Sequence, residues 1–194
     1  MATSAITASG RAAELGERLG GRAIVFVGLM GAGKTAIGRR VASSIGLPFS
    51  DSDHEIEKAS RMTVADLFDA YGEAEFRSLE QRVIVRLLLE APCVVATGGG
   101  AFMNADTRAA IGEAGISVWL KADIDTLMAR VMKKQTRPLL KTGNPREIME
   151  NLMKARYPIY ATADVTVNTR DDRREVIADE VVAAILAHLS EETP

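Results

Sequence analysis

The strongest constraint on the fold is the run GLMGAGKT at residues 28–35. Its glycines let the backbone wrap around a phosphate group with N–H groups pointing inward, Lys34 adds a positive charge for the β- and γ-phosphates, and Thr35 offers a hydroxyl to Mg²⁺. An apolar segment typical of a buried strand, 23–27, precedes the run, and a segment with helical periodicity, 35–45, follows it. The order strand, loop, helix is that of a P-loop, and it predicts nucleotide binding.

Predicted strands and helices alternate along the whole chain, which is the pattern of a parallel sheet with helices on both faces. The expected strands are 23–27, 47–51, 92–97, 116–121 and 163–167, and the expected helices are 11–19, 35–45, 56–61, 64–70, 73–89, 104–112, 123–132, 146–157 and 175–189. We expect one α/β domain of three layers, α/β/α, at 22–194. An extension at 1–21, a tail plus a short helix, precedes it.

Composition excludes several classes of protein. The 24 Lys and Arg against 26 Asp and Glu give a net charge of −2, so no overall field attracts nucleic acid or an anionic membrane. No apolar run approaches the ~20 residues of a membrane span. The single cysteine, Cys93, cannot form an internal disulfide and fits a reducing compartment. We therefore expect a cytoplasmic protein with no nucleic-acid or membrane partner.

Polar residues and glycines follow two of the expected strands. Asp51 and Asp53 follow the second strand, and the triple-glycine loop, residues 98–100, follows Thr97 at the end of the third. Because the carboxyl ends of parallel strands line the ligand crevice, the two carboxylates can hold Mg²⁺ through water and accept a proton. Capping of the next helix explains the aspartates equally well. Three glycines favour close approach to a ligand over a flexible turn.

Three arginines are candidates for binding an anionic substrate. Arg77 lies on an expected helix with Glu73 and Glu80, Arg137 lies in the loop-like stretch 133–145, and Arg156 lies at a helix end. Singly, each reads as a surface charge. A guanidinium also binds a carboxylate or phosphate through two hydrogen bonds, and an arginine in a lid can stabilise charge during phosphoryl transfer.

Together these motifs resemble those of the shikimate kinases. The matching segments are the P-loop, DSD at 51–53, GEAEFR at 72–77 with Glu80, TGGGA at 97–101, RPLL at 137–140 and RYPIY at 156–160. The resemblance implies a P-loop NTPase fold like that of nucleoside monophosphate kinases, with five parallel strands in the order 2-3-1-4-5. It also implies an insert near 52–80 that binds substrate, a lid near 132–144, and a monomer. The implied reaction transfers the γ-phosphoryl group of ATP to the 3-hydroxyl of shikimate, on the route to chorismate and the aromatic amino acids.

The resemblance also implies a role for each matching residue. ATP is expected to contact Gly31, Ala32, Gly33, Lys34, Thr35, Ala36, Arg130 and Arg137, and Mg²⁺ to be held by Thr35 and Asp51. Shikimate is expected to contact Asp53, Arg77, Gly98, Gly99, Gly100 and Arg156, with Glu57 and Glu80 positioning the arginines. The expected catalytic residues are Lys34, Asp53 and Arg137. Residues 168–174 lack the proline seen near the adenine in some relatives, so the resemblance gives no adenine contacts there.

Two other functions stay open from the sequence. Another small-molecule kinase of this fold, for gluconate or a nucleotide, would carry the same P-loop, although arginines on two separate elements favour an acidic polyol. A nucleotide-dependent switch or a nucleic-acid-binding protein belongs to a different class. The chain has no Asn-Lys-x-Asp motif for reading guanine, and its short length and net charge count against a nucleic-acid motor.

Overall fold

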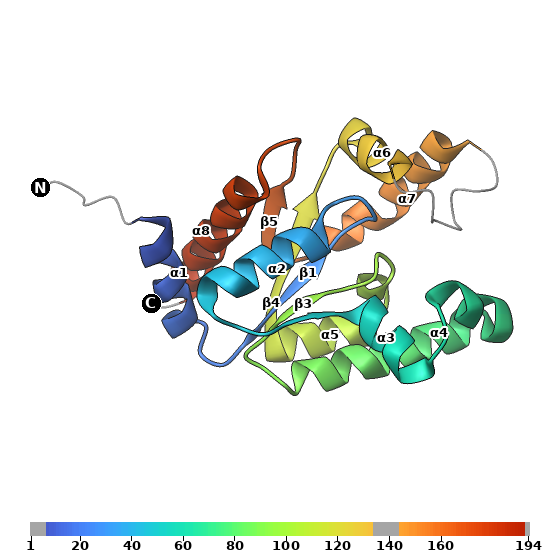
Figure 1. Cartoon of the computed structure of the whole chain (residues 1–194), viewed down its shortest axis with the longest axis horizontal. Coiled ribbons are helices and arrows are strands. Elements are labelled where there is room, and N and C mark those ends of the chain that lie inside the picture. The colour runs from blue at the N-terminus through green and yellow to red at the C-terminus, as the bar shows by residue number, and fades with distance from the viewer. Residues whose placement is uncertain (1–6, 134–143, 193–194) are drawn as a thin grey trace, which may run out of the picture.

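A computed structural model of the chain describes residues 7–133 and 144–192 (Figure 1). Arg137 and residues 134–143 of the expected lid lie outside the described residues, as does the tail at 1–6. The sheet contains five parallel strands in the order β2-β3-β1-β4-β5, which confirms the expected topology. The strands are β1 (Ala23–Val27), β2 (Phe49–Asp51), β3 (Val94–Ala96), β4 (Gly115–Lys121) and β5 (Val165–Asn168).

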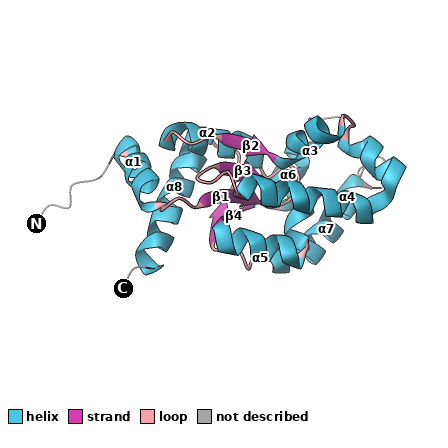
Figure 2. Cartoon of the chain, turned by 90° about the horizontal axis from the view of Figure 1, so that it is seen from below, coloured by secondary structure: helices cyan, strands magenta, loops and turns pink. Residues whose placement is uncertain are grey.

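The central strands are covered on both faces. Every residue of β1 and β3 is buried, as is every residue of β4 except Lys121, so side chains on both faces of these strands are shielded from water. One group of helices contains α1 (Ala8–Arg18), α2 (Lys34–Ile45) and α8 (Arg174–Glu192), which pack against one another. The other contains α4 (Val64–Leu88) and α5 (Ala105–Ala114), and Figure 2 shows the strands between the two groups. The three expected layers are therefore present.

The segment between β2 and β3 forms two helices that pack against each other, α3 (Ser52–Ser60) and α4. The helix α3 begins four residues before the expected start because the Asp51 side chain accepts a hydrogen bond from the Asp53 amide (3.1 Å) and caps the helix directly after β2. The two helices expected at 64–70 and 73–89 form one element with a break at Gly72, whose φ is 78° and ψ is 175°.

Two helices follow β4 on the other side of the P-loop. The helix α6 (Ile124–Met132) is capped by Asp123, whose side chain accepts a hydrogen bond from the Thr126 amide (2.7 Å). The helix α7 (Pro145–Tyr160) extends three residues beyond the expected end and includes Pro158. A short 3₁₀ turn, η1 (Ala101–Met103), connects the triple-glycine loop to α5.

The helix of the N-terminal extension, α1, packs into the core. Leu15, within α1, is 0% exposed, and Leu19, at the C-cap of α1, is 1% exposed. Arg18 donates a hydrogen bond to Ser190 (3.1 Å) at the far end of α8, and Arg22 forms an ion pair there. None of the described helices is long and apolar enough to cross a membrane.

Candidate active site

A cavity of about 490 Å³ opens at the edge of the sheet where the strands end. Because all five strands are parallel, the loops that follow them meet at this edge. The lining includes residues 30–37 from the P-loop and α2, Asp51, Asp53, residues 97–99, Arg130, Lys133 and residues from the segment 169–177. All the expected ATP-binding residues from Gly31 to Ala36 line it, and so does Arg130.

The P-loop has the geometry of an anion site. Gly33, at the N-cap of α2, has φ 102°, a left-handed conformation that favours glycine. The Lys34 Nζ donates hydrogen bonds to the carbonyl oxygens of Gly28 (2.6 Å) and Leu29 (3.0 Å) and so lies over the loop. Because a helix N-terminus carries partial positive charge, α2 and Lys34 both favour phosphate here.

Thr35 and Asp51 meet at the mouth of the P-loop. The Thr35 hydroxyl donates to Asp51 Oδ2 (2.7 Å), while Asp51 Oδ1 accepts from the Asp53 amide (3.1 Å). Asp51 therefore caps α3, as one of the two expectations had it, and it also lies beside the P-loop hydroxyl, where the other expectation places Mg²⁺. No group of three or more acidic, His or Cys side chains among the described residues could hold a metal. One carboxylate with one hydroxyl still fits Mg²⁺, which takes few protein oxygens and fills its remaining positions with phosphate and water.

The surroundings of Asp53 favour its protonated form on balance. Burial raises the pKa of its carboxyl, the neighbouring Asp51 and Glu57 raise it further, and Lys34 and Arg77 oppose the rise. A carboxyl with a raised pKa is better suited to accept a proton near neutral pH.

Arg77 is held by carboxylates and aromatic rings. Its Nη1 donates to Glu80 (2.7 Å), and its Nη2 pairs with Glu73 (3.3 Å). Its guanidinium carbon lies 5.6 Å from the ring centre of Phe68 and 5.3 Å from that of Phe76. Glu80 is 2% exposed, and burial raises its pKa. The expected bracing of Arg77 by Glu80 is therefore present.

The triple-glycine loop packs against these charged groups. A Cβ on Gly98 would lie 2.6 Å from Glu80 Oε1 and 2.7 Å from Asp53 Oδ1, and one on Gly100 would overlap the Arg77 guanidinium. Arg156 from α7 donates to the Gly99 carbonyl (2.9 Å). The structure thus brings Asp53, both arginines and the loop together.

Several contacts in this region differ from what sequence reasoning gave or were missed. Glu57, which the resemblance places beside the arginines, accepts a hydrogen bond from the Val64 amide (3.1 Å) at the start of α4. The hydroxyl of Thr97, which is not among the expected site residues, donates to the Phe26 carbonyl (2.9 Å). Sequence reasoning gave no role to Ser52, which accepts from the Gly98 amide (3.0 Å), or to Tyr160, which donates to the Gly99 carbonyl. The available signals were the position of Ser52 between two aspartates and that of Tyr160 one helical turn after Arg156.

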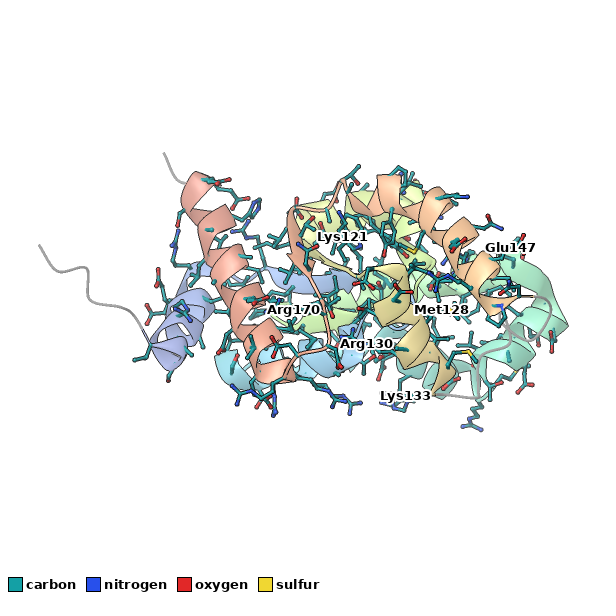
Figure 3. All side chains as sticks on the ribbon, turned by 90° about the horizontal axis from the view of Figure 1, so that it is seen from above. Lys121, Met128, Arg130, Lys133, Glu147 and Arg170 are labelled. Carbon is teal, nitrogen blue, oxygen red and sulfur yellow. The ribbon has the colours of Figure 1, made fainter. Side chains whose placement is uncertain are left out.

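Arg130 connects the P-loop to the segment after β5. Its guanidinium donates to the carbonyl oxygens of Gly31 and Ala32 (both 3.2 Å), to Thr169 Oγ1 (2.8 Å) and to the Arg170 carbonyl (2.5 Å). Arg130 on α6 and Arg170 after β5 lie close together, and both line the cavity (Figure 3). Arg130 therefore joins the P-loop to the segment after β5 where both line the cavity.

Comparisons with known proteins agree with this geometry. The family described as shikimate kinase matches residues 30–186. A shikimate kinase from Mesorhizobium japonicum is 68% identical over 171 residues, 88% of this chain and 84% of that protein. A shikimate kinase from Brucella canis is 60% identical over 174 residues, 90% of this chain and 87% of that protein. The chain belongs to the shikimate kinase family. It is therefore an ATP-dependent kinase acting on shikimate, as the motifs indicate.

Solved structures extend the comparison. A shikimate kinase from Acinetobacter baumannii, in complex with shikimate, matches with a TM-score of 0.82 and 36% identity, covering 86% of this chain and 93% of that one. A gluconokinase from Sinorhizobium meliloti matches with a TM-score of 0.54 and 17% identity, covering 90% of this chain and 98% of that one. At that identity the gluconokinase shares the fold alone. The shikimate kinase reading is thus favoured over the gluconate alternative.

Proposed function

We propose that the cavity divides the shikimate kinase reaction between a donor half at the P-loop and an acceptor half at the triple-glycine loop. The observation that carries this division is the placement of Arg77 and Arg156, which come from different helices yet both contact the loop beside Asp53. Two guanidinium groups are suited to clamping a carboxylate. In this proposal they bind the shikimate carboxylate, while Gly98, Gly99 and Gly100 let the ring approach the backbone.

In the donor half, the amides from Gly31 to Ala36 and the Lys34 ammonium bind the ATP phosphates, and Arg130 lies beside the adenine. Thr35 and Asp51 hold Mg²⁺, which neutralises phosphate charge when it is bound. Both proposals are supported by the exposed Thr35 hydroxyl, the carboxylate next to it and the cavity that these residues line.

In the acceptor half, Asp53 orients the shikimate 3-hydroxyl and accepts its proton as that oxygen attacks the γ-phosphoryl group. Burial raises the Asp53 pKa above its ordinary value, which supports this role because a more basic carboxylate accepts a proton more readily. Lys34, which also influences the Asp53 carboxyl, neutralises charge on the transferring group. Arg137 is proposed to close over that group as part of a lid near 132–144, and the insert near 52–80 to carry the acceptor. We further propose a monomeric, cytoplasmic enzyme.

The first experiment measures ADP release with ATP and Mg²⁺ in the presence of shikimate, gluconate or nucleoside monophosphates. Release should depend on shikimate, and equal release without any acceptor would contradict the transferase reading. The second compares Arg77→Ala with the wild type. The KM for shikimate should rise far more than the KM for ATP, because only the acceptor half loses a cation; equal changes in both would argue against the carboxylate clamp.

A further inference from the structure

Hydrogen bonds from outside the triple-glycine loop hold it in place. Three consecutive glycines have little intrinsic preference for one backbone conformation, so contacts must impose the orientation that a ligand requires. The Gly98 amide donates to the buried Ser52 hydroxyl (3.0 Å), and the Met103 amide donates to the Gly100 carbonyl (3.0 Å). These bonds fix the two ends of the loop and leave its middle residue to be fixed by another element.

The Gly99 carbonyl receives two hydrogen bonds from α7. One comes from Arg156 Nη1 (2.9 Å), and the other comes from the hydroxyl of Tyr160, one helical turn further along. Tyr160 is 0% exposed, and its ring packs between Phe102 (centroids 6.4 Å apart) and Trp119 (6.0 Å). Burial raises the pKa of Tyr160 to about 12, so its hydroxyl keeps its proton throughout the neutral range. The donor is therefore fixed in both position and protonation state.

Fixing one carbonyl also fixes the amide that follows it. The peptide group is planar and trans, so the Gly99 oxygen and the Gly100 N–H point in opposite directions. With the oxygen held toward α7, the Gly100 N–H faces away from α7, at the residue that packs against Arg77. A loop rotated at Gly99 would change both its contact with Arg156 and the close approach of Gly100 to Arg77. One hydroxyl thus links the two proposed carboxylate-binding arginines.

We propose that Tyr160 is a positioning residue for the acceptor, because its hydroxyl holds the Gly99 carbonyl and so keeps the triple-glycine loop and Arg156 arranged for shikimate. The inference rests on the proposed roles of Gly99 and Arg156 in binding shikimate. Tyr160, like Arg77 and Arg156, is not among the residues that line the cavity, and it contacts the triple-glycine loop and not the P-loop. Its effect should therefore be confined to the acceptor half.

Tyr157 provides a matched control on the same helix. Its hydroxyl donates to the Ala122 carbonyl (2.5 Å), and its ring contacts Trp119 edge-on with centroids 5.0 Å apart. Tyr157→Phe therefore removes the same chemical group from the same helix, again from a bond to a backbone carbonyl beside Trp119. That carbonyl lies after β4 and not in the triple-glycine loop.

The test compares the steady-state kinetics of Tyr160→Phe, Tyr157→Phe and the wild type, with shikimate binding measured by calorimetry. Tyr160→Phe should raise the KM and the Kd for shikimate about 3- to 10-fold, the range expected for one net hydrogen bond, and leave the KM for ATP nearly unchanged. Tyr157→Phe should leave both KM values nearly unchanged. A general loss of packing in α7 would instead affect both variants, or both substrates, alike.

An unchanged shikimate KM in a folded Tyr160→Phe enzyme, or equal rises for shikimate and ATP, would overturn the inference. Should the phenylalanine variant not fold, 4-fluorophenylalanine in place of Tyr160 fills most of the hydroxyl volume without donating, and the same outcomes decide. Arg156→Ala separates the two proposals. A normal shikimate KM in Arg156→Ala refutes the proposed clamp. A raised shikimate KM in Arg156→Ala together with a normal shikimate KM in Tyr160→Phe refutes only the role of Tyr160.

Discussion

Replacing Gly100 by alanine tests the acceptor half by adding a single methyl group. The added Cβ would lie closer than 3.0 Å to three atoms of the Arg77 guanidinium, a separation that real Cβ atoms essentially never show. Ordinary carbon contacts are about 3.5–4.0 Å, so the guanidinium must move by roughly 1 Å. Because the displaced atoms are the end of a flexible side chain, the free energy of unfolding should fall by less than about 1 kcal/mol.

The effect on binding should be much larger than the effect on stability. Because the side chain is flexible, the guanidinium can move while it keeps its 2.7 Å bond to Glu80, and its displacement then disrupts its proposed bond to the shikimate carboxylate. A hydrogen bond to a charged group contributes about 1.5–3 kcal/mol, so the KM for shikimate should rise about 10- to 150-fold. The KM for ATP should change little, because the three atoms nearest to the added methyl group all belong to Arg77 and not to the P-loop.

Two other glycines calibrate the result. A Cβ on Gly99 would have its nearest neighbours at 3.6 Å, an ordinary contact, so Gly99→Ala should raise the shikimate KM much less than Gly100→Ala. A Cβ on Gly112, in α5, meets nothing within 4 Å. Gly112→Ala should therefore keep wild-type kinetics and increase the free energy of unfolding by about 0.5–1 kcal/mol. ADP-release kinetics give the KM values of each variant, and urea melts give its free energy of unfolding. Equal shikimate KM values for the 99 and 100 variants would refute the reasoning about Arg77.

Three further predictions address other parts of the molecule. Asp53→Asn should lower turnover by a factor of about 10²–10⁴ if this carboxyl accepts the proton, and a small loss in a kinetic assay would make it an orienting group instead. Because the fold raises the Tyr160 pKa from 10.0 to about 12, the stabilisation tied to its protonated form is complete below pH 10 and is lost as the pH rises through 12. Urea melts over that range should show an added decline, at most about 1.4 kcal/mol per pH unit, that Tyr160→Phe lacks. Leu15→Ala should cost about 2–5 kcal/mol in the same melts without changing either KM, because α1 belongs to the core; a loss below about 1 kcal/mol would contradict that.

The strands were predictable because each is an apolar run that local sequence shows. Their order was predictable because the motifs resemble those of a family with a known sheet order. Strands buried on both faces are mainly apolar along their whole length. The segments 23–27 and 116–121 have this composition. Helix boundaries were less certain where one side chain decides them. Capping by Asp51 moved the start of α3, and Pro158 did not end α7, since only one helical turn is affected so close to its C-terminus.

The candidate site was predictable where a motif carries its own chemistry. Lys34 and Thr35 follow from the P-loop alone, and Arg77 and Glu80 are close on one helix. The contact between Tyr160 and Gly99 joins residues 61 positions apart. The helical spacing places Tyr160 on the same face as Arg156, but it does not indicate the loop that both contact. The Ser52 contact with Gly98 spans 46 positions, and the place of Ser52 between two aspartates does not indicate that partner. Arg137 lies outside the described residues, so its role stays a prediction.

The aromatic packing behind the triple-glycine loop gives the protein an intrinsic fluorescent reporter. Trp119 is the only tryptophan in the chain, it is 4% exposed, and its indole contacts both Tyr157 and Tyr160 of α7. Fluorescence excited selectively at the indole therefore comes from one site, where the sheet meets α7, the helix that bears Arg156. Movement of α7 during a catalytic cycle should alter the emission without any attached dye, so stopped-flow recordings can follow the unmodified enzyme in real time.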